Sequence, residues 1–303
     1  MSEGRRRFHD YQDLMHYRIM DILLVSTPYD TFILEEAGEL AERMLGEFRN
    51  LDLHYAPALT GVTSGAEALR IARERGINLI ITTPHLPDMD AAELARQVQD
   101  EGLDIPVVLL AWDTRELREF EARVDTSAIE RTFLWQGDAR ILVAIVKSVE
   151  DRRNVEHDTH AVGVQVILLI EDNVRYYSSF LPVIYTELLQ HSRRVVKEGL
   201  NLSQQIMRMR ARPKILLCTT WEEAEANFDR YADDVLGIIS DVQFPREGMK
   251  SPQAGADFAK EVGAAYPDIP IILHSSRPEN ETLAESVDAN FLLKGSPLLL
   301  QEL

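Results

Sequence analysis

The chain has 303 residues, of which 45% are hydrophobic, and its 50 acidic against 32 basic side chains give a formal net charge of -18. This length supports two domain cores. The negative field of the protein would repel a nucleic-acid backbone. The apolar runs are far shorter than the roughly 20 residues that a membrane span needs. A single cysteine, Cys218, excludes an internal disulfide, so we expect a cytoplasmic protein that binds neither nucleic acid nor membrane.

The first half of the chain alternates short apolar runs with helical patterns. Five apolar runs predict strands: Asp21 to Val25, near Ala58 to Val62, Asn78 to Thr82, Ile105 to Leu110, and Phe133 to Trp135. Five further segments predict helices: Thr31 to Arg49, Ala66 to Arg75, Ala91 to Asp100, Arg115 to Val124, and Ala139 to Arg153. Strands that alternate with helices indicate an α/β domain with a doubly wound parallel sheet, which we assign to residues 1–153.

A polar stretch without periodicity follows, from Asn154 to Gly163. This composition predicts an irregular linker between two domains.

The second half, residues 164–303, has the same layout. Its predicted strands are Val166 to Ile170, Ile215 to Cys218, Val235 to Ser240, Ile269 to His274, and Phe291 to Leu293. A long helical stretch runs from Val174 to about Arg212, with an interruption at Gly199. The loop after Asp241 is longer than its counterpart and predicts a flap. Few residues remain after Lys294, so we expect a truncated last helix, whose place a second copy of the chain or the linker region would take.

The two halves align with each other as an internal repeat. Ile105-Pro106 matches Ile269-Pro270, and Phe133-Leu134 matches Phe291-Leu292. The sequence therefore predicts two five-stranded doubly wound domains in tandem.

Charged residues distinguish the second half. Glu171 and Asp172, then Asp241, then Lys294 each stand at the carboxyl end of a predicted strand. Ligands gather at this edge of an open parallel sheet. Three neighbouring carboxylates repel one another unless a cation lies among them, and Mg²⁺ suits an oxygen-rich site.

This arrangement favours phosphoryl transfer to a carboxylate. Asp241 could act as the nucleophile, with Lys294 as a cation opposite the metal. Ser275, at the end of the intervening strand, could donate its hydroxyl to a phosphoryl oxygen and so move its loop, although Ser276 stands beside it.

These residues resemble the receiver domain of two-component response regulators. The resemblance implies these roles: an acidic pair at Glu171 and Asp172, a phosphoacceptor at Asp241, a switch hydroxyl at Ser275, a switch aromatic at Phe291, a lysine at Lys294, and a metal-binding backbone carbonyl at Gln243. Two departures are Gly295, which follows the lysine where the family usually has proline, and the longer loop after Asp241.

The first half resembles the same family with the site erased. The neutral counterparts are Ser26 and Thr27 at the acidic pair, Thr83 at the phosphoacceptor, Ala111 at the switch hydroxyl, and Gln136 at the lysine. The resemblance implies a pseudo-receiver that is not phosphorylated. The opening stretch, with Asp21 to Val25 and Thr31 to Glu36, is also similar to the front end of bacterial proteins that carry a phosphoenolpyruvate synthase or pyruvate phosphate dikinase type domain.

The leading hypothesis is a Mg²⁺-dependent phosphoacceptor module, not itself an enzyme, that receives its phosphoryl group on Asp241 from a sensor histidine kinase or a phosphotransfer protein. The alternative is a structural or dimerisation module that is not phosphorylated. It would regulate a larger phosphotransfer enzyme, with a second copy of the chain or a C-terminal enzymatic domain as its partner.

Overall fold

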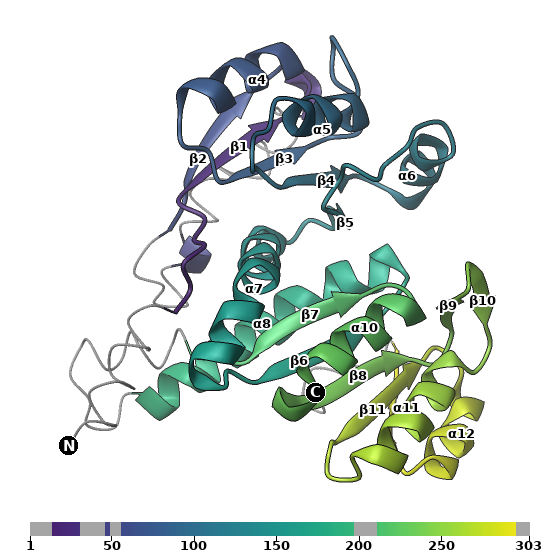
Figure 1. Cartoon of the computed structure of the whole chain (residues 1–303). Coiled ribbons are helices and arrows are strands. Elements are labelled where there is room, and N and C mark those ends of the chain that lie inside the picture. The colour runs from purple at the N-terminus through teal and green to yellow at the C-terminus, as the bar shows by residue number, and fades with distance from the viewer. Residues whose placement is uncertain (1–13, 31–45, 49–55, 197–210, 295–303) are drawn as a thin grey trace, which may run out of the picture. The chain divides into compact units, whose positions relative to one another are not determined.

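The computed structural model describes residues 14–30, 46–48, 56–196 and 211–294. Most of the predicted helix from Thr31 to Arg49, the interruption at Gly199 and the truncated last helix lie outside the described residues. The chain forms two compact units (Figure 1). We call them the N-terminal unit, which consists of Tyr17–Glu150 and Val174–Thr186, and the C-terminal unit, whose described residues are 14–16, 151–173, 187–196 and 211–294.

The N-terminal unit contains a parallel sheet in the order β2-β1-β3-β4-β5. Its strands are β1 Asp21–Val25, β2 Ala58–Val62, β3 Leu79–Thr82, β4 Val107–Ala111 and β5 Arg131–Leu134. The helices that connect or follow them are α4 Gly65–Glu74, α5 Ala91–Asp100, α6 Thr114–Glu121 and α7 Arg140–Val162, of which only the part up to residue 150 belongs to this unit. Every residue of β3 and β4 is buried, which explains why these strands are continuous apolar runs.

The C-terminal unit repeats this topology, with the order β12-β11-β8-β6-β7. Its parallel strands are β6 Val166–Ile170, β7 Lys214–Cys218, β8 Val235–Asp241, β11 Ile271–Ser275 and β12 Asn290–Leu293. Its helices are α8 Val174–Val196, of which only the part from residue 187 belongs here, then α10 Trp221–Tyr231, α11 Ala254–Ala265 and α12 Glu281–Ser286. In chain order, both sheets have the arrangement 2-1-3-4-5 of doubly wound flavodoxin-like folds. The predicted fold class is confirmed.

The predicted irregular linker is wrong, because Asn154 to Val162 is the continuation of helix α7. Its apolar Val155 is buried in the core of the C-terminal unit, together with Val166 and Leu168 of β6. The linker region therefore packs on the second sheet instead of crossing solvent.

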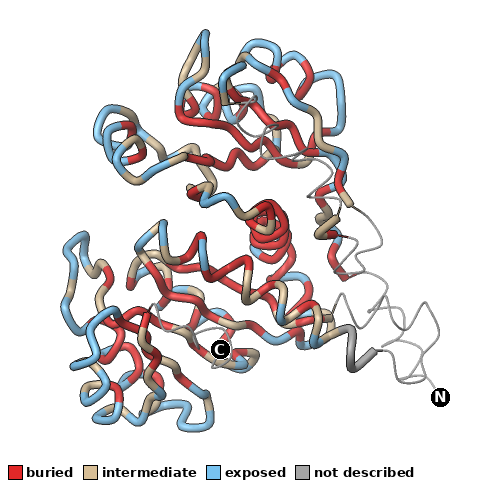
Figure 2. The backbone as a smooth tube through the Cα atoms, turned by 180° about the vertical axis from the view of Figure 1, so that it is seen from behind, coloured by how far each residue is buried: buried red, intermediate tan, exposed pale blue. Residues whose placement is uncertain are grey.

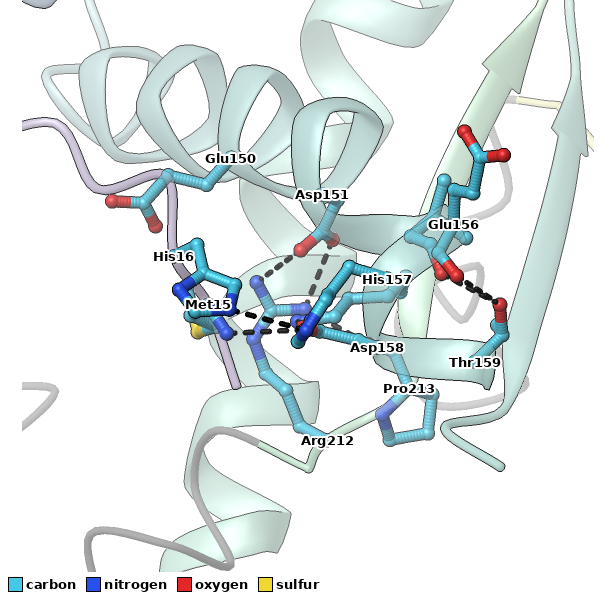
Figure 3. A network of polar contacts seen from close by, with 12 residues as sticks. Met15, His16, Glu150, Asp151, Glu156, His157, Asp158, Thr159, Arg212 and Pro213 are labelled. Atoms are coloured by element: carbon cyan, nitrogen blue, oxygen red, sulfur yellow. Dashed lines mark hydrogen bonds and ion pairs between the residues drawn. The ribbon is translucent and has the colours of Figure 1, made fainter. Parts of the chain in front are cut away.

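Two carboxylates of α7, one on each side of the predicted boundary at residue 154, are buried in ion pairs (Figure 3). Asp151 accepts two bonds from the Arg212 guanidinium, at 2.9 and 2.7 Å, and one from the N–H of Ile215 at 2.9 Å. Asp158 lies 2.8 Å from the Lys214 ammonium. Burial lowers the pKa of Lys214, while the two carboxylates oppose that shift. The charged residues are thus internal ion pairs that hold α7 against the start of β7.

The first half of α8 lies against strand β5 in the N-terminal unit. The N–H of Leu134 donates to Ser178 Oγ at 3.0 Å, and the Tyr177 hydroxyl donates to the carbonyl of Thr132 at 2.6 Å. The rings of Tyr177 and Phe133 meet edge to face, with centroids 5.8 Å apart. Helix α8 thereby covers the edge strand of this sheet, a position where open backbone groups otherwise invite aggregation.

Burial is concentrated on the inner strands of both sheets, whereas most residues of the edge strands β2 and β12 are exposed or intermediate (Figure 2). No helix among the described residues is both long and apolar enough to cross a membrane.

Candidate functional site

The carboxyl ends of four strands meet at one edge of the C-terminal sheet. Parallel pairing sets Ile170 beside Ser240, and His274 beside Asp241, so the residues that follow β6 lie next to the end of β8. Ser275 ends β11, and Lys294 follows β12 directly. Its backbone N–H donates to the carbonyl of Ser275 at 2.7 Å.

The structure brings the predicted acidic residues and the lysine together. Glu171, Asp172 and Asp241 each offer a carboxylate oxygen, and these oxygens lie within 4.8 Å of one another. The Lys294 ammonium lies 2.6 Å from Glu171 Oε2 and 2.8 Å from Asp241 Oδ2. It therefore bridges two of the three carboxylates.

Burial makes the electrostatics of this cluster strong. The side chain of Glu171 is 0% exposed, that of Lys294 is 3% exposed and that of Asp241 is 10% exposed. Burial raises the pKa of Glu171 to about 7; the Lys294 ammonium opposes this shift, and the Asp241 carboxylate adds to it. A group with a pKa this close to neutrality changes its charge easily when a cation arrives.

His274 is a residue of this site that the sequence analysis missed. Its Nδ1 lies 3.6 Å from Glu171 Oε2, and the residue is 1% exposed. Burial and the nearby Lys294 lower the pKa of His274 well below its ordinary value, so the imidazole is neutral at pH 7. The signal in the sequence is a histidine at the end of an otherwise apolar strand, directly before Ser275.

The long loop after Asp241 is a β-hairpin of β9 Phe244–Arg246 and β10 Met249–Ser251. Its turn residues Glu247 and Gly248 have φ values of 53° and 74°, as a two-residue hairpin turn requires. Lys250 extends from β10 to Asp172, with Nζ 2.9 Å from Oδ2 and 3.3 Å from Oδ1. The sequence analysis predicted a flap here but missed this ion pair.

The other predicted residues occupy the same edge with different contacts. The Ser275 hydroxyl accepts bonds from the Asn280 amide at 2.8 Å and from the N–H of Arg277 at 3.2 Å. Phe291 is partly buried against the core of the unit. Gln243 is half-buried in the turn that follows Asp241, and its carbonyl stays a predicted ligand.

The donor set fits Mg²⁺, because it consists of carboxylate oxygens from adjacent strand ends and two of the three carboxylates are buried. A site for a softer metal would present sulfur or imidazole ligands, and among the described residues only this acidic group has the geometry of a metal site.

The corresponding edge of the N-terminal sheet has no such chemistry among its described residues. Thr83 is buried, and its hydroxyl donates to the carbonyl of His85 at 3.4 Å. Thr27 accepts from the N–H of Asp30, and Ala111 is an apolar core residue. The Gln136 amide donates to the carbonyl of Arg175 at 3.0 Å and accepts from the Ser179 hydroxyl at 3.2 Å. Ser26, the remaining counterpart, is buried.

Comparisons with known proteins return no family model and no curated protein that matches the sequence. Among solved structures, the signal receiver domain of an HD domain-containing protein from Pseudomonas fluorescens Pf-5 is similar, with 20% identity and a TM-score of 0.34, over 46% of this chain and 93% of that chain. The receiver domain of the Francisella response regulator 1452 is also similar, with 14% identity and a TM-score of 0.31, over 44% of this chain and 98% of that chain.

A third similar structure is a putative two-component system response regulator/GGDEF domain protein. It has 14% identity and a TM-score of 0.35, over 93% of this chain and 95% of that chain. None of these three structures exceeds 20% identity or a TM-score of 0.35.

Proposed function

We propose that the C-terminal unit accepts a phosphoryl group on Asp241 and acts as the receiver module of a two-component signalling pathway. One observation carries this proposal: a buried ammonium, Lys294, bridges the carboxylates of Glu171 and Asp241 at the carboxyl edge of a doubly wound sheet. An ion-pair network that only stabilises the fold has no need of a third carboxylate, Asp172, within 4.8 Å.

The chemistry uses the chain's own groups as follows. A carboxylate oxygen of Asp241 attacks the phosphorus of a phosphodonor, either a phosphohistidine or a small acyl phosphate. One oxygen–phosphorus bond forms while the bond from phosphorus to the leaving atom breaks. The leaving group keeps the electron pair: the imidazole of a phosphohistidine then takes a proton from solvent, whereas the carboxylate released from an acyl phosphate stays ionised. The product is an aspartyl phosphate.

The surrounding residues balance the charge of this step. Glu171, Asp172 and Asp241 would hold Mg²⁺, which would supply positive charge to neutralise the transferring oxygens. The Lys294 ammonium, which is already in contact with Asp241, pairs with a phosphoryl oxygen from the other side. Neutral His274 adds no competing positive charge beside Glu171.

The response reaches the neighbouring strand through Ser275. Its hydroxyl leaves the bonds from Asn280 and Arg277 to donate to the phosphoryl group, which releases the start of the segment that leads into α12. The N-terminal unit serves as a pseudo-receiver, because Thr83 and Gln136 provide neither a nucleophilic carboxylate nor a cation.

The test is incubation of the full chain with acetyl phosphate and MgCl₂, followed by intact-mass analysis. We expect one hydroxylamine-labile phosphoryl group, lost in Asp241→Asn and retained in the matched variant Thr83→Val. Labelling that persists in Asp241→Asn contradicts the assignment. A wild-type chain that stays unlabelled, with beryllofluoride also failing to bind, favours the structural module instead.

A further inference from the structure

The β9–β10 hairpin places a second ammonium at the acidic site. Lys250 contacts both oxygens of Asp172, at 2.9 and 3.3 Å. The acidic site therefore holds three carboxylates and two ammoniums among its described residues. Lys294 contacts Glu171 and Asp241, and Lys250 contacts Asp172.

The position of Lys250 is built into the fold, because the hairpin is anchored at three other points. Phe244 is fully buried and stacks on Trp221, with ring centroids 6.4 Å apart. The Arg246 guanidinium lies 3.8 Å above the Trp221 ring, a close cation–π contact. The N–H of Glu247 donates to Glu222 Oε1 at 2.6 Å.

These anchors also hold a non-glycine residue in a left-handed conformation. Glu247 has a φ of 53°, which costs free energy that the surrounding contacts must offset. A hairpin tied in this way presents Lys250 to Asp172 as a fixed feature of the unit.

The two ammoniums differ in how easily they can leave. The Lys294 side chain is 3% exposed, whereas the Lys250 side chain is 54% exposed and Asp172 is 18% exposed. Ion pairs at such exposed positions are weak, because water competes for both partners. A divalent cation that takes the oxygens of Asp172 would therefore displace Lys250 and leave Lys294 in place.

We propose that Lys250 is a resident counter-cation of Asp172 that a divalent metal must displace, so that the hairpin lowers the affinity of the acidic site for divalent cations. The inference rests on the proposed metal site and adds its regulation. While Lys250 contacts Asp172, each carboxylate of the site is paired with an ammonium. Once the metal is bound, the Lys250 ammonium is released from Asp172.

The test is direct metal binding by the full chain, measured by calorimetry with MgCl₂ and by counting free Mn²⁺ with electron paramagnetic resonance. We expect Lys250→Gln to bind both ions about two- to fivefold more tightly than wild type, the range set by a weak exposed ion pair. Lys260→Gln, an exposed lysine on α11 with the same change in net charge, should bind as wild type does. In an Asp172→Asn background, Lys250→Gln should change nothing.

The outcomes separate the two proposals. If wild type binds the metal, Asp172→Asn weakens it, and Lys250→Gln equals wild type, the role of Lys250 is overturned and the metal site stands. An equal gain in Lys260→Gln also overturns it, because the effect is then one of net charge. If no variant binds either ion, the metal site and the role of Lys250 both fall.

Discussion

Gly255, near the start of α11, lies directly against the backbone carbonyl of Asp241. A Cβ atom at residue 255 would lie 2.1 Å from that carbonyl oxygen and 3.0 Å from the carbonyl carbon. The N–H of Gly255 donates to the carbonyl of Val242 at 3.0 Å, which fixes the approach. The end of β8, and with it the Asp241 side chain, is therefore positioned by a contact that only glycine permits.

Gly255→Ala is expected to lower the free energy of unfolding by about 2 to 3 kcal/mol, because the backbone must shift to accommodate the methyl group. It should also reduce labelling of Asp241. The matched control is Gly263→Ala in the same helix, where a Cβ atom meets nothing within 4 Å. This variant should raise the free energy of unfolding by about 0.5 to 1 kcal/mol. Urea unfolding compares the two; equal effects would show that the contact does not constrain β8.

Lys294→Met is expected to lower the free energy of unfolding by about 3 to 5 kcal/mol in metal-free buffer, because it leaves the buried carboxylates of Glu171 and Asp241 without their shared cation. Adding Glu171→Gln should recover part of the loss by removing one negative charge. Lys260→Met serves as the exposed control and should change stability by less than about 0.5 kcal/mol. A small effect of Lys294→Met would mean that water already screens the pair.

The pH dependence of stability should reveal two opposing slopes. Glu171 has a raised pKa of about 7 against 4.5 in the unfolded chain, so its contribution is complete below pH 4.5 and is lost as pH rises through 7. His274 has a lowered pKa against 6.5 when unfolded, so its contribution is complete above pH 6.5 and is lost as pH falls. Between about pH 4.5 and 6.5 the two effects offset each other in the wild type.

Single variants separate the slopes. On acidification from pH 6.5 to 5, Glu171→Gln should lose stability relative to wild type, by at most about 1.4 kcal/mol per pH unit. His274→Asn should gain stability relative to wild type over the same interval. Urea titrations at several pH values, with chelator present, measure both differences. Curves that run parallel to the wild type would rule out both shifts.

Arg212→Met is expected to lower the free energy of unfolding by about 3 to 5 kcal/mol, because Asp151 loses its guanidinium partner in the interior. The Asp151 side chain is 0% exposed and that of Arg212 is 1% exposed. The double variant Asp151→Asn with Arg212→Met should recover a substantial part of the stability that Arg212→Met loses. Arg70→Met removes an exposed partner of Glu74 and should cost less than about 1 kcal/mol. Additive single and double effects would show that Asp151 and Arg212 are not coupled.

Thr83→Asp should not gain a phosphoryl group from acetyl phosphate, because Ser26, Thr27 and Gln136 provide neither a carboxylate pair nor a cation. Placing an ionised carboxylate at this buried position should instead lower stability. Mass analysis in an Asp241→Asn background isolates the new residue. Phosphorylation at position 83 would show that the N-terminal edge still activates a carboxylate.

The sheets could be predicted from the sequence because buried parallel strands are continuous apolar runs; β6 has the bounds that its run predicts. The continuation of α7 into the second unit could not be predicted from the sequence. Asp158 in the predicted linker indicates solvent as long as its buried partner Lys214 is unknown, and that partner lies far along the chain. Sequence spacing aligned Glu171, Asp241 and Lys294 at one edge, but the reach of Lys250 depends on the hairpin twist and on the anchors of Phe244 and Arg246.

The division of α8 has a consequence for how the protein is made. The N-terminal unit needs Val174–Thr186 to cover β5, and those residues leave the ribosome only after β6 of the other unit has been synthesised. Until then, Leu134 N–H and the Thr132 carbonyl lack the partners that Ser178 and Tyr177 provide. Domain-by-domain folding during synthesis is thus interrupted, and a fragment that ends at residue 150 carries an open sheet edge that the whole chain closes.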